Sequence, residues 1–384
     1  MDRAGFPSDT VSSHQVQIPG VARLAAWGVL DRLQEAGTPP TRRIRFDAQG
    51  VVLDGEFPAG DGGVDTLYSP RRSLLDSALV DAARAAGAEV RERARVEELV
   101  WSEGRVTGVR LSSGRGGAAV TESARLVVGA DGKHSSVAQA VGARVYREVP
   151  VRAFASYTYW RGLPTVAGGG EMYQRRGQAV AVFPTNDDLT MVYLSCPIAE
   201  FDAFRTNLEG NYRARLARCG DLGERLAAAE RVERLRTTPD QPNRFRVPYG
   251  PGWALVGDAG VVMDSVSAQG ISNALRDAEL LADAAGAALL DPPAPGPHGE
   301  AAPFAAYHRL RDRGIAPMYG FTTDLARHTA GRTERLFFAA LAGRPDEISR
   351  CLGAFAGITR PDRYFTAGTL LRAYGGRVCS RAAA

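Results

Sequence analysis

The sequence has almost no lysine and no long apolar run. Lys133 is its one lysine, so nearly all of its 47 basic residues are arginines. Acidic residues are interleaved with them, the formal net charge is only +4, and no polybasic run typical of nucleic-acid or anionic-membrane binding occurs. No stretch reaches the roughly 18 uninterrupted apolar residues that a membrane span needs. We therefore expect neither nucleic acid as a partner nor integral membrane association.

Cysteine is also scarce. The four cysteines, Cys196, Cys219, Cys351 and Cys379, form no Cys-x-x-Cys and do not lie near paired histidines at metal-binding spacing. This usage is typical of a reduced chain with incidental thiols. The first residues contain no apolar segment of the kind that forms a signal peptide. The sequence therefore predicts a cytoplasmic protein without a metal site.

What the sequence does contain is ordinary for a globular protein. It has 384 residues, 45% hydrophobic and 23% charged, which suits two domains or one large two-part fold. Apolar periodicity predicts helices over 20–33, 72–87, 200–235 and 270–290, and a mostly helical region over 304–384. It predicts strands within 42–57 and at 89–92, 96–102, 106–111, 126–130, 151–161, 178–184, 189–195 and 253–258. Residues 292–303 are rich in proline and glycine and predict a surface loop.

Two segments share one pattern, in which an apolar strand ends in an acid and a glycine-containing turn. The first is Val-Val-Gly-Ala-Asp-Gly at 127–132, and the second is Leu-Val-Gly-Asp-Ala-Gly at 255–260. Such turns lie at the carboxyl end of a parallel sheet, where α/β folds bind ligands. A helix that begins there favours a negatively charged or electron-rich group. Each segment alone also fits a purely structural turn, but the second is longer and more specific.

Together these segments resemble the two downstream FAD signatures of the aromatic-hydroxylase-like flavoprotein family, which includes single-component FAD monooxygenases and geranylgeranyl-reductase-like enzymes. The matching residues are Asp131, Gly132 and Ser135 in the first segment, and Gly257, Asp258, Gln269, Gly270 and Asn273 in the second. The resemblance implies an α/β fold with a Rossmann-like FAD-binding domain whose first βα unit is missing, an inserted antiparallel substrate-binding sheet and a helical C-terminal region. The implied division is 1–150 and 248–330 for the FAD-binding domain, 151–247 for the substrate sheet and 331–384 for the helical region.

The resemblance also implies roles for these residues. Asp258 would hydrogen-bond the ribityl chain of FAD. The backbone of the turn formed by Gln269, Gly270 and Asn273 would lie at the pyrimidine edge of the flavin. The segment of Asp131 and Gly132 would support the pyrophosphate and the docking of NAD(P)H, the electron donor of the hydroxylases.

Further positions resemble the family near the start of the chain. Asp2 and Arg3 resemble the acidic end of the second Rossmann strand, which holds the adenosine ribose. Residues 8–10 and 12–14, including His14, resemble the loop that follows it. The segment 70–75 resembles one whose arginine approaches the flavin or its phosphates, which points to Arg72. For Arg71 and Arg72 the alternative is a pair of solvated arginines at a helix start.

The sequence departs from the family in one large respect. The fingerprint Gly-x-Gly-x-x-Gly, expected about 20 residues before the acid, is absent because the sequence begins one residue before Asp2. We expect a mis-assigned start within a longer gene; the alternative is a truncated protein that binds FAD weakly or not at all. Two smaller departures are the lack of a proline within 263–266 and the presence of Ala138 where an arginine is usual.

No residue stands out as a catalytic acid or base. His14 is the best placed of the histidines, and Tyr157 and Tyr159 share one face of a predicted strand, where core packing is the alternative to substrate contact. The resemblance implies an FAD-dependent oxidoreductase, with an NAD(P)H-dependent monooxygenase acting on a small organic substrate as the leading hypothesis. The alternatives are a geranylgeranyl-reductase-like flavin reductase and a non-catalytic remnant.

Overall fold

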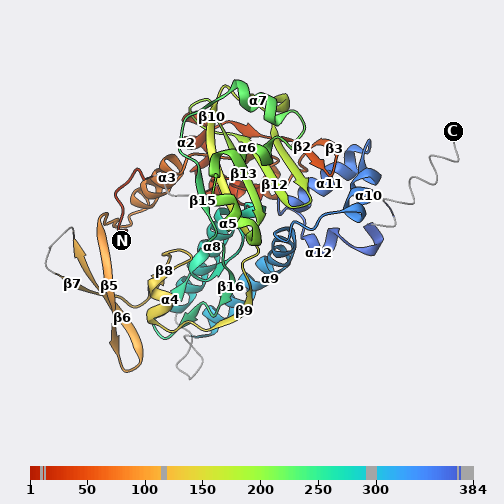
Figure 1. The fold of residues 1–384 in the computed structure, drawn as a ribbon. Helices are drawn as coiled ribbons and strands as arrows, with labels where there is room; N and C mark the ends of the chain where they lie inside the picture. The colour runs from red at the N-terminus through yellow and green to blue at the C-terminus, as the bar shows by residue number, and fades with distance from the viewer. Residues whose placement is uncertain (9–11, 13, 114–118, 291–300, 370–371, 373–384) are drawn as a thin grey trace.

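The computed structural model describes residues 1–8, 12, 14–113, 119–290, 301–369 and 372. A large sheet with helices on both faces forms one part of the molecule, and two long helices lead from it to several smaller sheets (Figure 1). Asp9, Thr10, Ser13, Cys379 and most of the predicted loop at 292–303 lie outside the described residues. No helix in the described part of the chain combines the length and apolarity that crossing a bilayer requires.

The large sheet has eight strands. They are β2 (Arg43–Ala48), β3 (Val51–Glu56), β10 (Ala153–Arg161), β11 (Gly170–Arg175), β12 (Gln178–Pro184), β13 (Leu189–Pro197), β14 (Glu230–Arg231) and β15 (Arg236–Thr238). Their order is β14-β10-β13-β12-β11-β2-β3, with β15 also paired to β10. The sheet was predicted to be antiparallel, but it is mixed. The reason is that β2, far upstream, joins β11 in parallel, with Ile44 opposite Gly170.

Alternation along β10 separates the two faces of this sheet. Phe154 and Trp160 are buried against the short helices on one face, and Tyr157 and Tyr159 face the opposite side. The first face is covered by α5 (Phe201–Arg205), α6 (Leu208–Leu216) and α7 (Leu222–Ala228). The second packs against α10 (Arg332–Leu341), α11 (Pro345–Phe355) and α12 (Pro361–Tyr364). The predicted helix over 200–235 is therefore wrong as one unit, because three short helices and β14 occupy it.

A second, smaller sheet carries the two acid-glycine turns. It consists of β17 (Tyr249–Gly250), β18 (Trp253–Leu255) and β8 (Val127–Gly129). Strands β8 and β18 are parallel, with Gly129 opposite Leu255, as the pattern predicted. Helix α8 (Gly270–Leu289) follows the second turn, and α1 (Ile18–Ala26) and α9 (Ala301–Leu325) pack against it. The first turn leads into α4 (Ser136–Ala140).

The remaining elements are short or peripheral. They are α2 (Leu30–Glu35), α3 (Arg72–Ala85), β1 (Pro40–Thr41) with β4 (Leu67–Tyr68), β9 (Val145–Val149) with β16 (Asn243–Arg246) and β19 (Val261–Val262), and the meander of β5 (Ala94–Ser102), β6 (Arg105–Ser113) and β7 (Val120–Ser123). The helix predicted over 20–33 is interrupted at Gly28, whose φ of +68° is outside the helical region. The strand predicted at 89–92 is wrong, because β5 begins only at Ala94.

Candidate functional site

The parallel pairing of β8 and β18 places the turns of Asp131 and Asp258 side by side. Both strands run in the same direction, so both turns leave the same end of the small sheet. The positive charges of Lys133, from the first turn, and of Arg72, at the start of α3, both act on the Asp258 carboxyl. Segments that lie far apart in the sequence therefore meet at this point.

Asp258 presents an unused carboxylate there. The residue is partly buried, and no described residue donates a hydrogen bond to its side chain. Burial raises the pKa of Asp258, while the charges of Lys133 and Arg72 oppose that rise. The preceding Gly257 has a φ of +59°, and a Cβ on it would lie 3.2 Å from the Cβ of Ala274 on α8. The turn thus needs glycine, and it holds an acceptor ready for the hydroxyl groups of a ligand.

The N-terminus of α8 is open in the same region. This 20-residue helix has no side-chain cap and no acidic residue in its first turn. Gly270 is exposed, and the space where its Cβ would lie is empty. The side chains of Gln269 and Asn273 are engaged within the protein, with the Phe355 carbonyl (3.1 Å) and with Arg276 (2.7 Å). The backbone N–H groups and the positive end of the helix dipole are therefore what the turn offers to a ligand.

Asp131 has a different role in its turn. Its carboxylate accepts hydrogen bonds from Ser135 Oγ (2.5 Å), from the Ser136 backbone (2.7 Å) and hydroxyl (2.8 Å), and from the Val137 backbone (3.1 Å). Burial works to raise the pKa of Asp131, but these hydrogen bonds outweigh it and the pKa is lowered. Gly132 has a φ of +80°, as the turn requires. The Asp131 carboxylate therefore satisfies backbone N–H groups at the start of α4 and holds the turn in place through these hydrogen bonds.

The arginines at the start of α3 are held by partners. Arg72 donates two hydrogen bonds to Asp76, both 2.8 Å long. Arg71 forms an ion pair with Glu233 (2.7 Å) and stacks 4.1 Å above the ring of Tyr159. Their side chains are 21% and 14% exposed, so the alternative of two solvated arginines is wrong.

The first residues lie apart from these groups in their contacts. Asp2 and Arg3 are exposed, and Asp2 Oδ1 accepts a hydrogen bond from the Ala4 backbone (2.7 Å). The Asp2 backbone pairs with Arg91 and Ala94, next to the first residues of β5. Asp2 therefore follows the edge of the meander, and its predicted contact with a ribose stays a prediction.

His14 is buried between the large sheet and α3. Its Nδ1 lies 3.1 Å from the Ser69 carbonyl, and its ring stacks on Tyr159 at 5.5 Å between centroids. Burial and the charge of Arg71 lower the pKa of His14 to about 3, against the hydrogen bond with Ser69. The imidazole is therefore neutral at physiological pH, with Nδ1 as the donor to the carbonyl.

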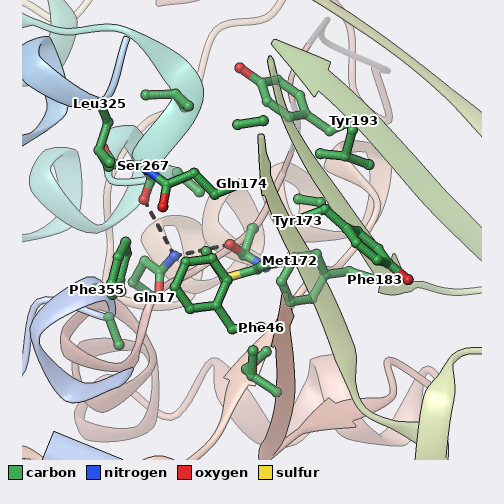
Figure 2. A pocket seen from close by; sticks show the side chains of 18 of the residues that line it. Gln17, Phe46, Met172, Tyr173, Gln174, Phe183, Tyr193, Ser267, Leu325 and Phe355 are labelled. Carbon is green, nitrogen blue, oxygen red and sulfur yellow. Dashed lines mark hydrogen bonds between the residues drawn. The ribbon is translucent and has the colours of Figure 1, made fainter. Parts of the chain in front are cut away.

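A cavity lies between the large sheet and the segment that precedes α8 (Figure 2). Ser265, Val266, Ser267 and Ala268 form one wall of it, and the other walls come from distant parts of the chain. They include Gln15, Gln17, Phe46, Met172, Gln174, Phe183, Tyr193, His328 and Phe355. The sequence analysis missed all of these residues. The alternation of residues along the strands predicts which side chains share a face of the sheet. It does not predict which of them line a cavity.

Asp264 immediately precedes this wall, and its burial makes the ionised form of its carboxyl group unfavourable. It is 1% exposed, its Oδ1 accepts a hydrogen bond from the Val266 backbone (2.9 Å), and its Oδ2 has no partner among the described residues. Burial raises the pKa of Asp264 to about 7, and the Val266 hydrogen bond opposes this only in part. Since the folded-state pKa exceeds the unfolded one, the folded protein gains stability as pH falls from 7 and bears the full cost above 7.

We therefore expect Asp264→Asn to stabilise the protein at pH 8, by at most about 1.4 kcal/mol for each unit of pKa difference. The gain should shrink as pH falls and vanish only below about pH 3, where the wild-type carboxyl is protonated in both states. Urea unfolding at pH 4.5, 6 and 8 measures it. Asp283→Asn, at an exposed position of α8, is the control and should change little. A difference between Asp264→Asn and wild type that stays constant with pH would contradict the prediction.

Comparison with known proteins gives matches over most of the chain. Residues 2–291 match the model of a family described as FAD binding domain. The protein named phenazine 1,6-dicarboxylic acid hydroxylase PhzS, from Lysobacter antibioticus, is 33% identical over 190 residues. That match covers 47% of this chain and 43% of the hydroxylase, so less than half of this curated relative is matched.

Solved structures share the fold over almost the whole chain. The myxobacterial chondrochloren halogenase CndH has a TM-score of 0.76 at 22% identity, covering 97% of this chain and 90% of its own. A flavoprotein/dehydrogenase from Cytophaga hutchinsonii has a TM-score of 0.80 at 17% identity, covering 100% and 92%. PqsL from Pseudomonas aeruginosa, titled a probable FAD-dependent monooxygenase, has a TM-score of 0.72 at 22% identity, covering 88% and 91%.

Proposed function

Because this chain belongs to the family described as FAD binding domain, we propose that it is an FAD-dependent monooxygenase that takes electrons from NAD(P)H and oxidises a small organic substrate. Its fold is that of FAD-dependent halogenases and monooxygenases, with mixed sheets and C-terminal helices. The partial match to a protein named a hydroxylase supports oxygen transfer over simple dehydrogenation.

One observation carries the proposal: an unused carboxylate and an uncapped helix N-terminus face the same region, next to an apolar cavity. The Asp258 carboxylate lacks a donor among the described residues, and α8 begins without a cap at Gly270. These two features fit the hydroxyls of a ribityl chain and the electron-rich edge of a flavin ring. The cavity begins at Ser265–Ala268, directly before α8, so a substrate there would lie near a ring held at Gly270.

In this proposal each residue group has a defined task. Asp258 would accept hydrogen bonds from the ribityl hydroxyls of FAD, and the first N–H groups of α8 would stabilise negative charge on the flavin. The charges of Lys133 and Arg72 act on Asp258, and although Lys133 is paired with Asp240 (2.9 Å) and Arg72 with Asp76 (2.8 Å), both would favour a negatively charged group of the cofactor there. Asp131 and Gly132 hold the turn that carries Lys133. The bound flavin supplies the redox chemistry, and the protein positions it and excludes water from the substrate.

Binding of FAD to the purified chain tests the proposal. We expect saturable quenching of FAD fluorescence on titration with protein. The loaded protein should then consume NADH or NADPH, with transfer of oxygen to substrate or release of hydrogen peroxide. A chain that binds no FAD would overturn the proposal. A loaded chain that accepts electrons from NAD(P)H but never reacts with O2 would replace it with a reductase.

A further inference from the structure

A second cavity adjoins the first on the side of the C-terminal helices. It is lined by Phe321 of α9, by Phe337 and Phe338 of α10, and by Phe355 and Phe365. Its volume is about 520 Å³, against about 80 Å³ for the cavity beside the sheet. We call the smaller one the inner chamber and the larger one the outer chamber. Gln174, Leu325 and Phe355 line both, so the two chambers adjoin at these residues.

The outer chamber is an aromatic box. The rings of Phe321 and Phe365 stack at 5.2 Å with 15° between their planes. Phe355 meets Phe321 edge-on at 5.2 Å and Phe365 at 6.2 Å. Aromatic walls of this kind bind extended apolar groups through area burial and ring contacts. Phe365 is 36% exposed, which is unusual for a large apolar side chain and places the box at the surface.

The inner chamber offers hydrogen bonds without charge. Among the described residues that line it, none is an aspartate, glutamate, lysine or arginine. Three polar atoms there are buried and have no partner in the described chain: Gln15 Nε2, Gln17 Oε1 and Gln174 Oε1. In Figure 2, Gln17 and Gln174 lie in the same part of the chamber, among Phe46, Met172 and Phe355.

His328, the one imidazole among the described residues of this lining, does not add a charge to the inner chamber. Its Nε2 lies 2.9 Å from Ser195 Oγ, which holds the ring. Burial and the charge of Arg215 lower the pKa of His328 to about 4, so it is neutral at physiological pH. A carboxylate in the inner chamber would therefore be buried without a cation, which is costly.

Among the described residues that line the two chambers, the charged ones lie at the outer rim. Asp324 and Arg327 line the outer chamber, but their side chains are 72% and 52% exposed and they form an ion pair with each other (3.2 Å). Glu334 accepts a hydrogen bond from the Gly331 backbone (2.9 Å) at the start of α10. These groups face solvent and leave the aromatic interior apolar.

We propose that the substrate is an uncharged, elongated molecule, with a ring or similar head that donates a hydrogen bond in the inner chamber and an apolar tail in the aromatic outer chamber. The head contacts Gln174, which lines both chambers and whose Oε1 has no partner among the described residues, so this oxygen can accept the O–H or N–H of the head. This inference rests on the proposed function only in taking the ligand of these chambers to be the substrate.

Three small probes separate the elements of the proposal: 4-heptylphenol, 4-methylphenol and 4-heptylbenzoate. At pH 7.5 the two phenols are neutral and the benzoate is ionised. Calorimetric titration of the protein without FAD, and again with FAD, gives the dissociation constants. We expect 4-heptylphenol to bind at least about 30-fold tighter than 4-methylphenol, because six added methylene groups leave water. We expect 4-heptylbenzoate to bind at least about 10-fold more weakly than 4-heptylphenol, because its charge has no partner.

Variants of the outer chamber localise the tail. Phe365→Ala and Phe321→Ala should each reduce the advantage of the heptyl chain several-fold. Leu336→Ala, at a 42% exposed position of α10 outside both linings, should not. Tighter or equal binding of the benzoate, no gain from the tail, or a gain that all three variants preserve would each overturn the proposal. Because the titration does not require FAD, a chain that binds the probes in this order but rejects FAD would refute the proposed function alone.

Discussion

Asp258→Ala is expected to weaken FAD binding by about 10- to 100-fold and to make the FAD-free protein more stable. The first effect follows because a hydrogen bond to a charged group contributes about 1.5–3 kcal/mol, and 1.4 kcal/mol is a factor of ten. The second follows because burial disfavours the ionised carboxyl, which no described residue hydrogen-bonds. A substitution that lowers affinity for FAD but raises the stability of the FAD-free protein indicates a residue that binds the ligand. A residue that supports the fold would lower stability when it is replaced.

Fluorescence titration with FAD and thermal unfolding of the FAD-free protein measure the two effects. Asp258→Asn retains an acceptor and should fall between wild type and Asp258→Ala in affinity. Asp283→Ala, at an exposed position on α8, is the matched carboxylate control and should alter neither quantity. If Asp258→Ala instead destabilised the FAD-free protein and left its affinity for FAD unchanged, the carboxylate would serve the turn and the cofactor assignment would be wrong.

The sequence predicted the ends of β8 and β18 well, for a physical reason. Both strands are short and apolar, although Val128 of β8 is 43% exposed, and the turn at each carboxyl end must satisfy local backbone constraints. Gly132 and Gly257 have positive φ values, which glycine adopts readily. Such constraints act within a few residues, so a pattern of consecutive residues contains them. Because both strands lead into such a turn, we expect them to lie parallel, and Gly129 does lie opposite Leu255 in a parallel pair.

The role of Asp131 was harder to predict from the same pattern. The resemblance implies that the segment of Asp131 and Gly132 supports the pyrophosphate and the docking of NAD(P)H, which stays a prediction, while the Asp131 carboxylate itself is occupied by the first turn of α4. A capping acid and a ligand-binding acid have the same spacing before a helix. Only the hydrogen-bond partners tell them apart, and these depend on side-chain rotamers.

The two chambers could not be predicted, because their residues come together only through tertiary packing. Gln174 lies on β11, a strand that the sequence analysis did not predict, and β11 joins β2 through parallel pairing with an upstream segment. In the sequence, nothing distinguishes Phe321 and Phe365 from other apolar residues. Their contact appears only in the structure, where the two rings stack. Single glutamines and phenylalanines carry no local signature, so their function emerges only from the assembled fold.

Arg225→Met is expected to destabilise the protein by about 3–5 kcal/mol, because it leaves a buried carboxylate without its cation. Glu171 on β11 is fully buried and accepts two hydrogen bonds from Arg225 of α7, at 2.8 and 2.6 Å. The Val166 backbone (2.8 Å) and the Tyr173 hydroxyl (2.5 Å) complete its set of donors. Burial works to lower the pKa of Arg225, but its hydrogen bonds with Glu171 prevail and raise it, which is the expected sign for a strong pair.

Urea unfolding of three variants distinguishes the cost of the orphaned charge from the value of the pair. Arg225→Met combined with Glu171→Gln removes both charges and should recover a large part of the loss, since a neutral amide is far less costly to bury than a carboxylate. Arg205→Met breaks an exposed pair with Asp202 and should cost no more than about 1 kcal/mol. A double variant as unstable as Arg225→Met would show that α7 is held to the sheet by the arginine itself rather than by charge compensation.

Loss of the ion pair between Arg225 and Glu171 should also affect the inner chamber, because side chains alternate between the two faces of β11. The Glu171 carboxylate meets Arg225 of α7 on one face of β11, whereas Met172 and Gln174 lie on the opposite face and line the inner chamber, which Tyr173 also borders. The ion pair therefore fixes from behind the strand that positions Gln174. We expect Arg225→Met, under conditions where it remains folded, to weaken 4-heptylphenol binding although Arg225 lines neither chamber, and the double variant to restore binding together with stability. Restored stability without restored binding would place the control of Gln174 elsewhere on β11.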